Sequence, residues 1–120
     1  MVLADTSVWV NHLRKGNSRL SALLHETGVV CHPCIVGELA CGNIKNRKEV
    51  LELIQSLPII PVITQDEFLH FVDSHKLMGL GLGFVDVHLL ASSRLAGIPI
   101  WTGDKSLQNA ADQLKLGYSH

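Results

Sequence analysis

The chain has 120 residues, of which 47% are hydrophobic and 18% charged, and its formal net charge is −1. This composition excludes a disordered polymer and predicts a single domain with a packed core, which we expect to be aliphatic because only 5% of the residues are aromatic. No apolar run approaches the roughly 18 residues of a membrane span, and three cysteines are too few for a disulfide framework, so we expect a soluble, cytoplasmic protein.

Short apolar runs alternate along the chain with longer segments of helical periodicity. We expect strands near residues 2–4, 29–31, 59–63, 99–102 and 115–118, with helices in most of the intervals. This alternation is typical of βαβ units. It predicts an α/β fold in which a central parallel sheet of about five strands is flanked by helices.

Capping residues mark the ends of several expected helices. Asp5, Thr6 and Ser7 follow the first strand, and any of them can cap a helix through "VWVNHLR". Pro33 suits the first turn of a helix through "PCIVGELACG", and Gly42 suits its end. A later helix is expected over about 85–96, where Gly97 provides the stop signal.

This topology brings four carboxylates to one edge of the sheet. Asp5 follows the first strand, and Glu38 lies about two turns into the helix after the second strand. A helix of about eleven residues that starts near Asp86 covers ~16 Å, and the return strand around "PIWT" covers a similar length, so Asp104 comes back beside it. We therefore expect four acids from four segments to converge where open α/β sheets bind ligands.

Carboxylates held that close repel one another unless a cation lies between them. A set made only of hard oxygen ligands favours Mg²⁺ or Mn²⁺ over Zn²⁺. Such an ion can activate water against a phosphodiester. Each acid alone has a simpler explanation, since an Asp at a helix start is usually a cap and Glu38 by itself is a typical solvated helix residue. The convergence of all four favours a metal-dependent hydrolase.

Four segments in this order, "VLADTSVWV", "GELACG", "GFVDVHLLASSRLAG" and "IWTGDKSL", resemble the motifs of PIN-domain ribonucleases of the VapC toxin type. The resemblance covers essentially the whole chain, so residues 1–120 are expected to form one PIN domain. It implies that the acidic quartet binds Mg²⁺ or Mn²⁺ and activates water for RNA cleavage, with Asp5 and Asp86 as the surest ligands. It also implies supporting hydroxyl roles for three residues: Thr6, Ser7 and Thr102.

The resemblance further implies three partners: an RNA substrate, a cognate antitoxin whose C-terminal segment blocks the acidic pocket, and a second copy of the chain in a homodimer. The chain departs from the family at Gly103, where relatives often carry Arg before the last Asp. Lys105 can compensate for the missing phosphate contact.

Charge is unevenly distributed, because residues 1–48 hold six basic and three acidic residues whereas residues 49–120 hold four and eight. The small net charge neither requires nor excludes a nucleic-acid partner, because the distribution decides how phosphates are bound. Six residues are candidates for contact with RNA, although ordinary solvated surface explains each of them alone: Arg14, Lys15, Lys45, Arg47, Lys48 and Lys105.

Three alternatives remain open. Cys31 and Cys34 form a C-x-x-C at a strand-to-helix junction, as in thioredoxin-like dithiol oxidoreductases. A zinc site built from these thiols with His32 and Cys41 is less favoured, because its ligands are cramped. A PIN-like fold can also act as a non-catalytic binding module. His88 lies two residues after Asp86, faces away from it on a helix, and is expected to pack in the core.

Overall fold

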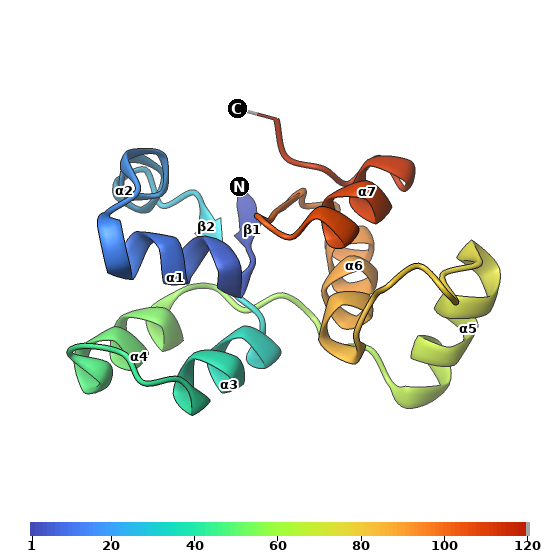
Figure 1. Ribbon diagram of the computed structural model, residues 1–120, viewed down its shortest axis with the longest axis horizontal. Coiled ribbons are helices and arrows are strands. Elements are labelled where there is room, and N and C mark those ends of the chain that lie inside the picture. The colour runs from blue at the N-terminus through green and yellow to red at the C-terminus, as the bar shows by residue number, and fades with distance from the viewer. Residues whose placement is uncertain (120) are drawn as a thin grey trace.

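The computed structural model describes residues 1–119, in which helices surround a short central sheet (Figure 1). In Figure 1, α1 to α4 lie on one side of the strands and α5 to α7 on the other. No helix within residues 1–119 is both long and apolar enough to cross a bilayer. The elements, in chain order, are β1 (Val2–Ala4), α1 (Thr6–Lys15), α2 (Ser18–His25), β2 (Val29–Val30), α3 (Pro33–Cys41), α4 (Arg47–Ser56), α5 (Gln65–His75), α6 (Phe84–Ala96), β3 (Ile100–Trp101) and α7 (Lys105–Gln113).

The sheet is parallel, with the strand order β2-β1-β3. Leu3 of β1 pairs with Val30 on one side and with Ile100 on the other. All three residues of β1 are fully buried, which explains why this strand is uninterruptedly apolar, as parallel strands covered on both faces are. The predicted α/β class is therefore confirmed, and β1 lies at its centre.

The strand expected over 59–63 is wrong. Only Ile59 forms a parallel bridge there, opposite Cys31. The N–H of Ile60 still donates to the carbonyl of Cys31 at 3.0 Å, but Pro61 has no N–H with which to extend the ladder.

The strand expected over 115–118 is likewise reduced to one parallel bridge, between Ile100 and Gly117. Lys115 has a φ of 60°, a left-handed conformation that cannot belong to a strand. The sheet thus has three strands, with a single bridge beyond each edge, instead of five.

The predicted helix ends are confirmed where capping residues marked them. The Asp5 carboxylate accepts the N–H of Thr6 at the start of α1. Pro33 is the first residue of α3, and Gly42 follows its last residue. Gly97 ends α6 with a φ of 68°, a conformation that glycine adopts without the steric cost other residues meet.

The core is mainly aliphatic, as predicted, but it also includes two tryptophans. Leu3, Leu89 and Leu90 are fully buried, and Trp9 and Trp101 are 1% and 8% exposed. The core therefore lies between the sheet and helices α1 and α6.

Helix α5 differs from the other helices in that it contributes no buried residue to the core. It packs against α6. In Figure 1 it lies at the outer end of the molecule, away from the strands. Its position leaves a groove along α6.

Candidate active site

Asp5 is held at the junction between β1 and α1, with only 7% of its surface exposed. Its Oδ1 accepts the N–H of Thr6 at 2.7 Å. Its Oδ2 accepts the hydroxyls of Ser7 at 3.0 Å and Thr102 at 2.7 Å. A buried carboxylate needs such partners to remain charged, and they fix its orientation toward the carboxyl edge of the sheet.

Thr102 connects the first and last acidic segments. Its hydroxyl donates to Asp5 and accepts the N–H of Asp104 at 3.0 Å. The N–H of Gly103 donates to Ser7 Oγ at 2.9 Å. These contacts hold the turn after β3 against the start of α1, although the two segments are almost a hundred residues apart. Asp104 is thereby brought to the same edge as Asp5.

Asp86 and Asp104 each use one carboxylate oxygen to cap a helix. Oδ2 of Asp86 accepts the N–H of Gly83 at 2.9 Å, at the start of α6. Oδ1 of Asp104 accepts the N–H of Leu107 at 2.8 Å, at the start of α7. Among residues 1–119, no donor contacts the second oxygen of either carboxylate. The capping explanation for these residues is therefore right, and it leaves one oxygen of each available.

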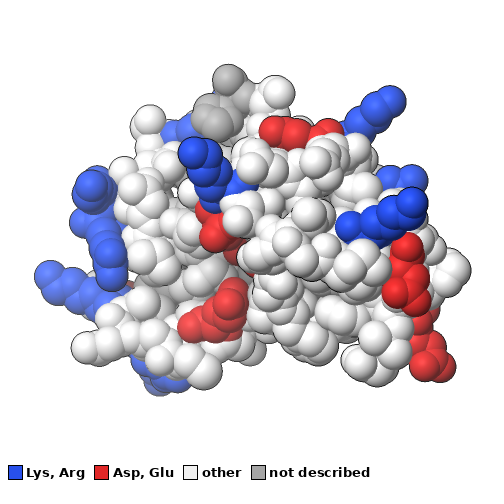
Figure 2. Space-filling model, turned by 45° about the vertical axis from the view of Figure 1, so that its right-hand side comes forward, with Lys and Arg blue, Asp and Glu red and all other residues white. Residues whose placement is uncertain are grey.

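The pKa of Asp86 shows that the acids share one electrostatic environment. Burial raises this pKa most, the charges of Asp5 and Asp104 raise it further, and the Gly83 N–H opposes the increase. Asp86 is therefore close enough to the other two aspartates for their charges to act on it. In Figure 2, acidic side chains lie in a depression near the middle of the face shown.

Glu38 joins this edge from the second turn of α3. It is exposed, and its Oε1 accepts the hydroxyl of Thr6 at 2.6 Å. Thr6 therefore contacts two of the predicted acids, Asp5 through its N–H and Glu38 through its hydroxyl. Hydrogen bonds link Asp5, Glu38 and Asp104 through the three predicted hydroxyls. Within the described chain, the Asp86 carboxylate bonds only to Gly83 at the start of its own helix and is related to the others through charge.

The donor set fits a hard divalent cation. Every charged candidate is a carboxylate, the ligand type that Mg²⁺ and Mn²⁺ prefer, and Glu38, Asp86 and Asp104 each have an oxygen without a donor among residues 1–119. Within these residues, no three His, Cys, Asp or Glu side chains are arranged to hold an ion as they stand.

His32 is a supporting residue that sequence reasoning considered only as a zinc ligand. It is fully buried. Its Nδ1 accepts the N–H of Cys34 at 3.0 Å, and its Nε2 lies 3.2 Å from Ser92 Oγ. Because Nδ1 accepts a backbone N–H, the ring proton is on Nε2, which donates a hydrogen bond to Ser92 Oγ. His32 thereby joins α3, which carries Glu38, to α6, which carries Asp86.

His88 packs in the core, as expected. It is 7% exposed and lies against the rings of Phe68, Phe84 and His32. Its Nδ1 is buried and has no hydrogen-bond partner in the described part of the chain.

The surroundings of Cys31 and Cys34 do not favour a reactive dithiol. Burial raises the pKa of the Cys31 thiol to about 11, and burial also raises the pKa of Cys34, followed by the charge of Glu38. A redox-active thiol needs the opposite shift, because the thiolate is the nucleophile. The oxidoreductase alternative therefore has no support from the thiol environment.

The candidate RNA-contacting residues come from three parts of the chain: the end of α1, residues 45–48 and the start of α7. Arg14 and Lys45 line one groove of about 400 Å³ between the end of α1 and the α3–α4 connection. Arg47 instead donates two hydrogen bonds to the carbonyl of Ala40, at 3.3 and 2.9 Å, and so joins α4 to α3. Lys105 is exposed beside Asp104. The remaining two, Lys15 and Lys48, are also exposed.

Replacing Thr102 by Val is expected to lower the free energy of unfolding by about 1–3 kcal/mol, because it leaves the Asp5 carboxylate and the Asp104 N–H without their shared partner. Thr102→Ser keeps the hydroxyl and should lose about 1 kcal/mol or less. Urea unfolding of the three proteins measures the difference. Equal stability of Thr102→Val and the wild type would show that the hydroxyl contributes nothing.

Comparisons with known proteins agree with the fold and the residue pattern. The model of the PIN domain family matches residues 2–113, so the chain belongs to this family, as its motifs predicted. Ribonuclease VapC32 of Mycobacterium tuberculosis, from strains CDC 1551 / Oshkosh and ATCC 25618 / H37Rv, is 48% identical to it over 111 residues, which are 92% of this chain and 90% of the relative.

Solved structures share the fold at lower sequence identity. The structure of FitAB bound to an IR36 DNA fragment contains a chain with a TM-score of 0.65 and 23% identity, covering 93% of this chain and 91% of that one. PAE2754 from Pyrobaculum aerophilum has a TM-score of 0.61 and 14% identity, covering 94% and 85%. At these identities the likeness establishes the fold alone.

Proposed function

We propose that this protein is a metal-dependent endoribonuclease that acts as the toxin of a toxin–antitoxin pair. The observation that carries the proposal is the meeting of Asp5, Glu38, Asp86 and Asp104 at one edge of the sheet, from four separate segments. Membership of the PIN family and 48% identity to a relative named as a ribonuclease support the same reaction.

The cofactor in this proposal is Mg²⁺ or Mn²⁺, held mainly by Asp5 and Asp86, with Glu38 and Asp104 acting through water or orienting the site. When bound, such an ion supplies an activated water and neutralises charge on the attacked phosphate. The chain's own residues prepare the ligands. Thr102 and Ser7 hold Asp5 in one orientation, and Thr6 holds Glu38 through one oxygen, which leaves its other oxygen available.

A non-catalytic binding module explains this arrangement less well. Burial, and after it the charges of Asp5 and Asp104, raise the pKa of Asp86, so its ionised form destabilises the metal-free fold. A scaffold has no use for carboxylates that repel one another. In a nuclease, a bound divalent cation would neutralise this repulsion.

The partners in this proposal are an RNA substrate, a cognate antitoxin and a second copy of the chain. Arg14 and Lys45, which share a groove, and Lys105, beside Asp104, are the candidates for contact with RNA phosphates. Gly103 has space for a side chain, since an added Cβ would lie 3.5 Å from Ser7 Oγ. Packing would therefore allow a larger side chain at this position, so steric hindrance does not explain why it lacks a basic residue.

Purified protein incubated with a mixed cellular RNA pool is expected to produce discrete fragments in Mg²⁺ or Mn²⁺, and none in excess EDTA. Sequencing of the fragment ends identifies the cleaved RNA. Cleavage that continues unchanged in EDTA would contradict the metal requirement. If no RNA is cut with either metal, the ribonuclease proposal fails.

A further inference from the structure

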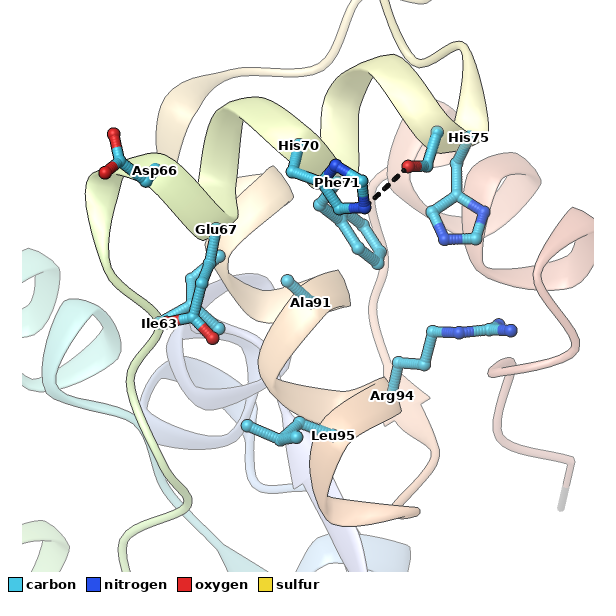
Figure 3. A pocket seen from close by; sticks show the side chains of 10 residues that line it. Ile63, Asp66, Glu67, His70, Phe71, His75, Ala91, Arg94 and Leu95 are labelled. Carbon is cyan, nitrogen blue, oxygen red and sulfur yellow. Dashed lines mark hydrogen bonds between the residues drawn. The ribbon is translucent and has the colours of Figure 1, made fainter.

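A groove of about 640 Å³ runs between α5 and α6 (Figure 3). Its apolar wall on α6 faces away from Asp86, because Ala91 and Leu95 follow Asp86 by five and nine residues, about 140° and 180° around the helix. Its volume is within the range of small-molecule sites. The carboxylate cluster does not account for it.

The floor and lower wall of the groove are apolar. Ile63 and Ala91 are 9% and 4% exposed, and Phe71 from α5 and the exposed Leu95 from α6 complete the surface. Figure 3 shows Ile63 in the segment before α5, Phe71 on α5, and Ala91 and Leu95 on α6, all lining the groove. The apolar part of a bound ligand would cover these side chains and so remove their surface from water.

One end of the groove carries basic groups from both helices. Arg94 extends from α6 toward His75 of α5, and His70 lies one turn before it (Figure 3). Figure 3 places the three side chains at the same end of the groove, and burial, followed by the charges of Arg94 and His70, lowers the pKa of His75. No carboxylate in residues 1–119 forms an ion pair with Arg94. This end therefore has an unneutralised cation with two imidazoles beside it.

The other end carries Asp66, which points outward in Figure 3, and Glu67, whose side chain runs down beside Ile63. Glu67 is engaged, because its Oε1 accepts the N–H of Thr64 at 2.8 Å in the capping box of α5. The groove is therefore polarised along its length. A ligand with one charged end can bind in only one direction, with an anionic head beside Arg94 and an apolar body toward Ile63 and Leu95.

We propose that the α5–α6 groove binds a small organic anion with an apolar body, for which a medium-chain carboxylate is the simplest model. Arg94 provides the charge-assisted contact and His75 a ring N–H donor, while Phe71, Ala91 and Leu95 contact the chain. His70 Nε2 lies 3.2 Å from Ser74 Oγ, so only its Nδ1 faces no partner among the described residues. The ligand would connect α5, which has no buried residue, to α6. This proposal is independent of nuclease activity.

The test is a titration of the ¹⁵N-labelled full chain with octanoate, followed by amide chemical shifts. We expect saturable shifts confined to α5 and α6, with a dissociation constant of about 1 mM for so small a ligand. Octan-1-ol is the matched neutral probe. Arg94→Met keeps the apolar stem of Arg94 but removes its charge, and should weaken octanoate binding about tenfold, to the level of octan-1-ol. Arg14→Met, on another groove, should bind octanoate as the wild type does.

Three results would overturn the proposal. The first is the absence of saturable shifts at the groove, and the second is equal affinity for octanoate and octan-1-ol in the wild type. The third is a set of groove shifts that follow protein concentration without ligand, which would assign the groove to contact between two copies of the chain. Unchanged octanoate affinity in Arg94→Met would remove Arg94 from the site and contradict its proposed role.

Discussion

Replacing Asp86 by Asn is expected to lower metal-dependent RNA cleavage by at least about a thousandfold, the loss of roughly 4 kcal/mol of transition-state stabilisation. Asn keeps the shape of the side chain, and its amide oxygen can still accept the N–H of Gly83 at the start of α6. What it removes is the negative charge beside Asp5 and Asp104. The proposed site would lose a ligand while the helix keeps its cap.

The same substitution should leave the metal-free protein at least as stable as the wild type. Burial and the neighbouring aspartates raise the pKa of Asp86 in the folded protein. For an acid, a raised pKa means that ionisation at neutral pH destabilises the fold relative to the unfolded chain. Removing the charge therefore relieves a destabilising interaction.

The matched control is Asp73→Asn, which removes an exposed carboxylate from α5 and should leave cleavage unchanged. Cleavage rates are measured in Mn²⁺, and melting temperatures in EDTA. If Asp86→Asn cuts RNA as fast as the wild type, Asp86 is not part of the reaction. A melting temperature well below that of the wild type in EDTA would refute the electrostatic argument.

Capping and metal binding are compatible at this site because a carboxylate has two oxygens. Asp86 and Asp104 each use one oxygen for a backbone N–H. The cap fixes the side chain at a helix start, and the helix start lies at the carboxyl edge of a parallel sheet. The same residue therefore explains both why the helix begins there and why a charge is available at that edge.

The parts of the fold that sequence could predict are those set by local chemistry and chain order. Asp5, Pro33 and Gly97 mark helix ends through interactions with adjacent backbone. The alternation of strands and helices then brings the acidic residues to one edge. Pro61 also indicates, from the sequence alone, that a strand after residue 59 is cut short, because proline has no N–H to extend the ladder.

The contacts that sequence could not predict join residues far apart in the chain. His32 meets Ser92 across 60 positions, and only the packing of α3 against α6 determines that pairing. The α5–α6 groove depends in the same way on how one exposed helix lies against another. A His before a Pro at a strand end indicates a helix cap, but nothing local identifies its second partner.

His32 should make the protein sensitive to acid. Burial, followed by the charge of His88, lowers the pKa of His32 from 6.5 to about 4. Between these values the unfolded chain binds a proton that the folded chain does not. Stability from this residue is therefore complete above pH 6.5 and is lost as the pH falls toward 4, by up to about 3 kcal/mol.

Urea unfolding in metal-free buffer, at pH values from 7 to 4, tests this expectation by comparing the wild type with His32→Asn. Asn can still accept the N–H of Cys34 but is too short to reach Ser92 and has no proton to gain. We expect the variant to be about 1–3 kcal/mol less stable at pH 7, with a difference that shrinks as the pH falls. His25→Asn, at an exposed position, should follow the wild-type profile. A constant difference between the wild type and His32→Asn across this range would show that His32 does not govern the acid response, because the two proteins would then take up the same number of protons on unfolding.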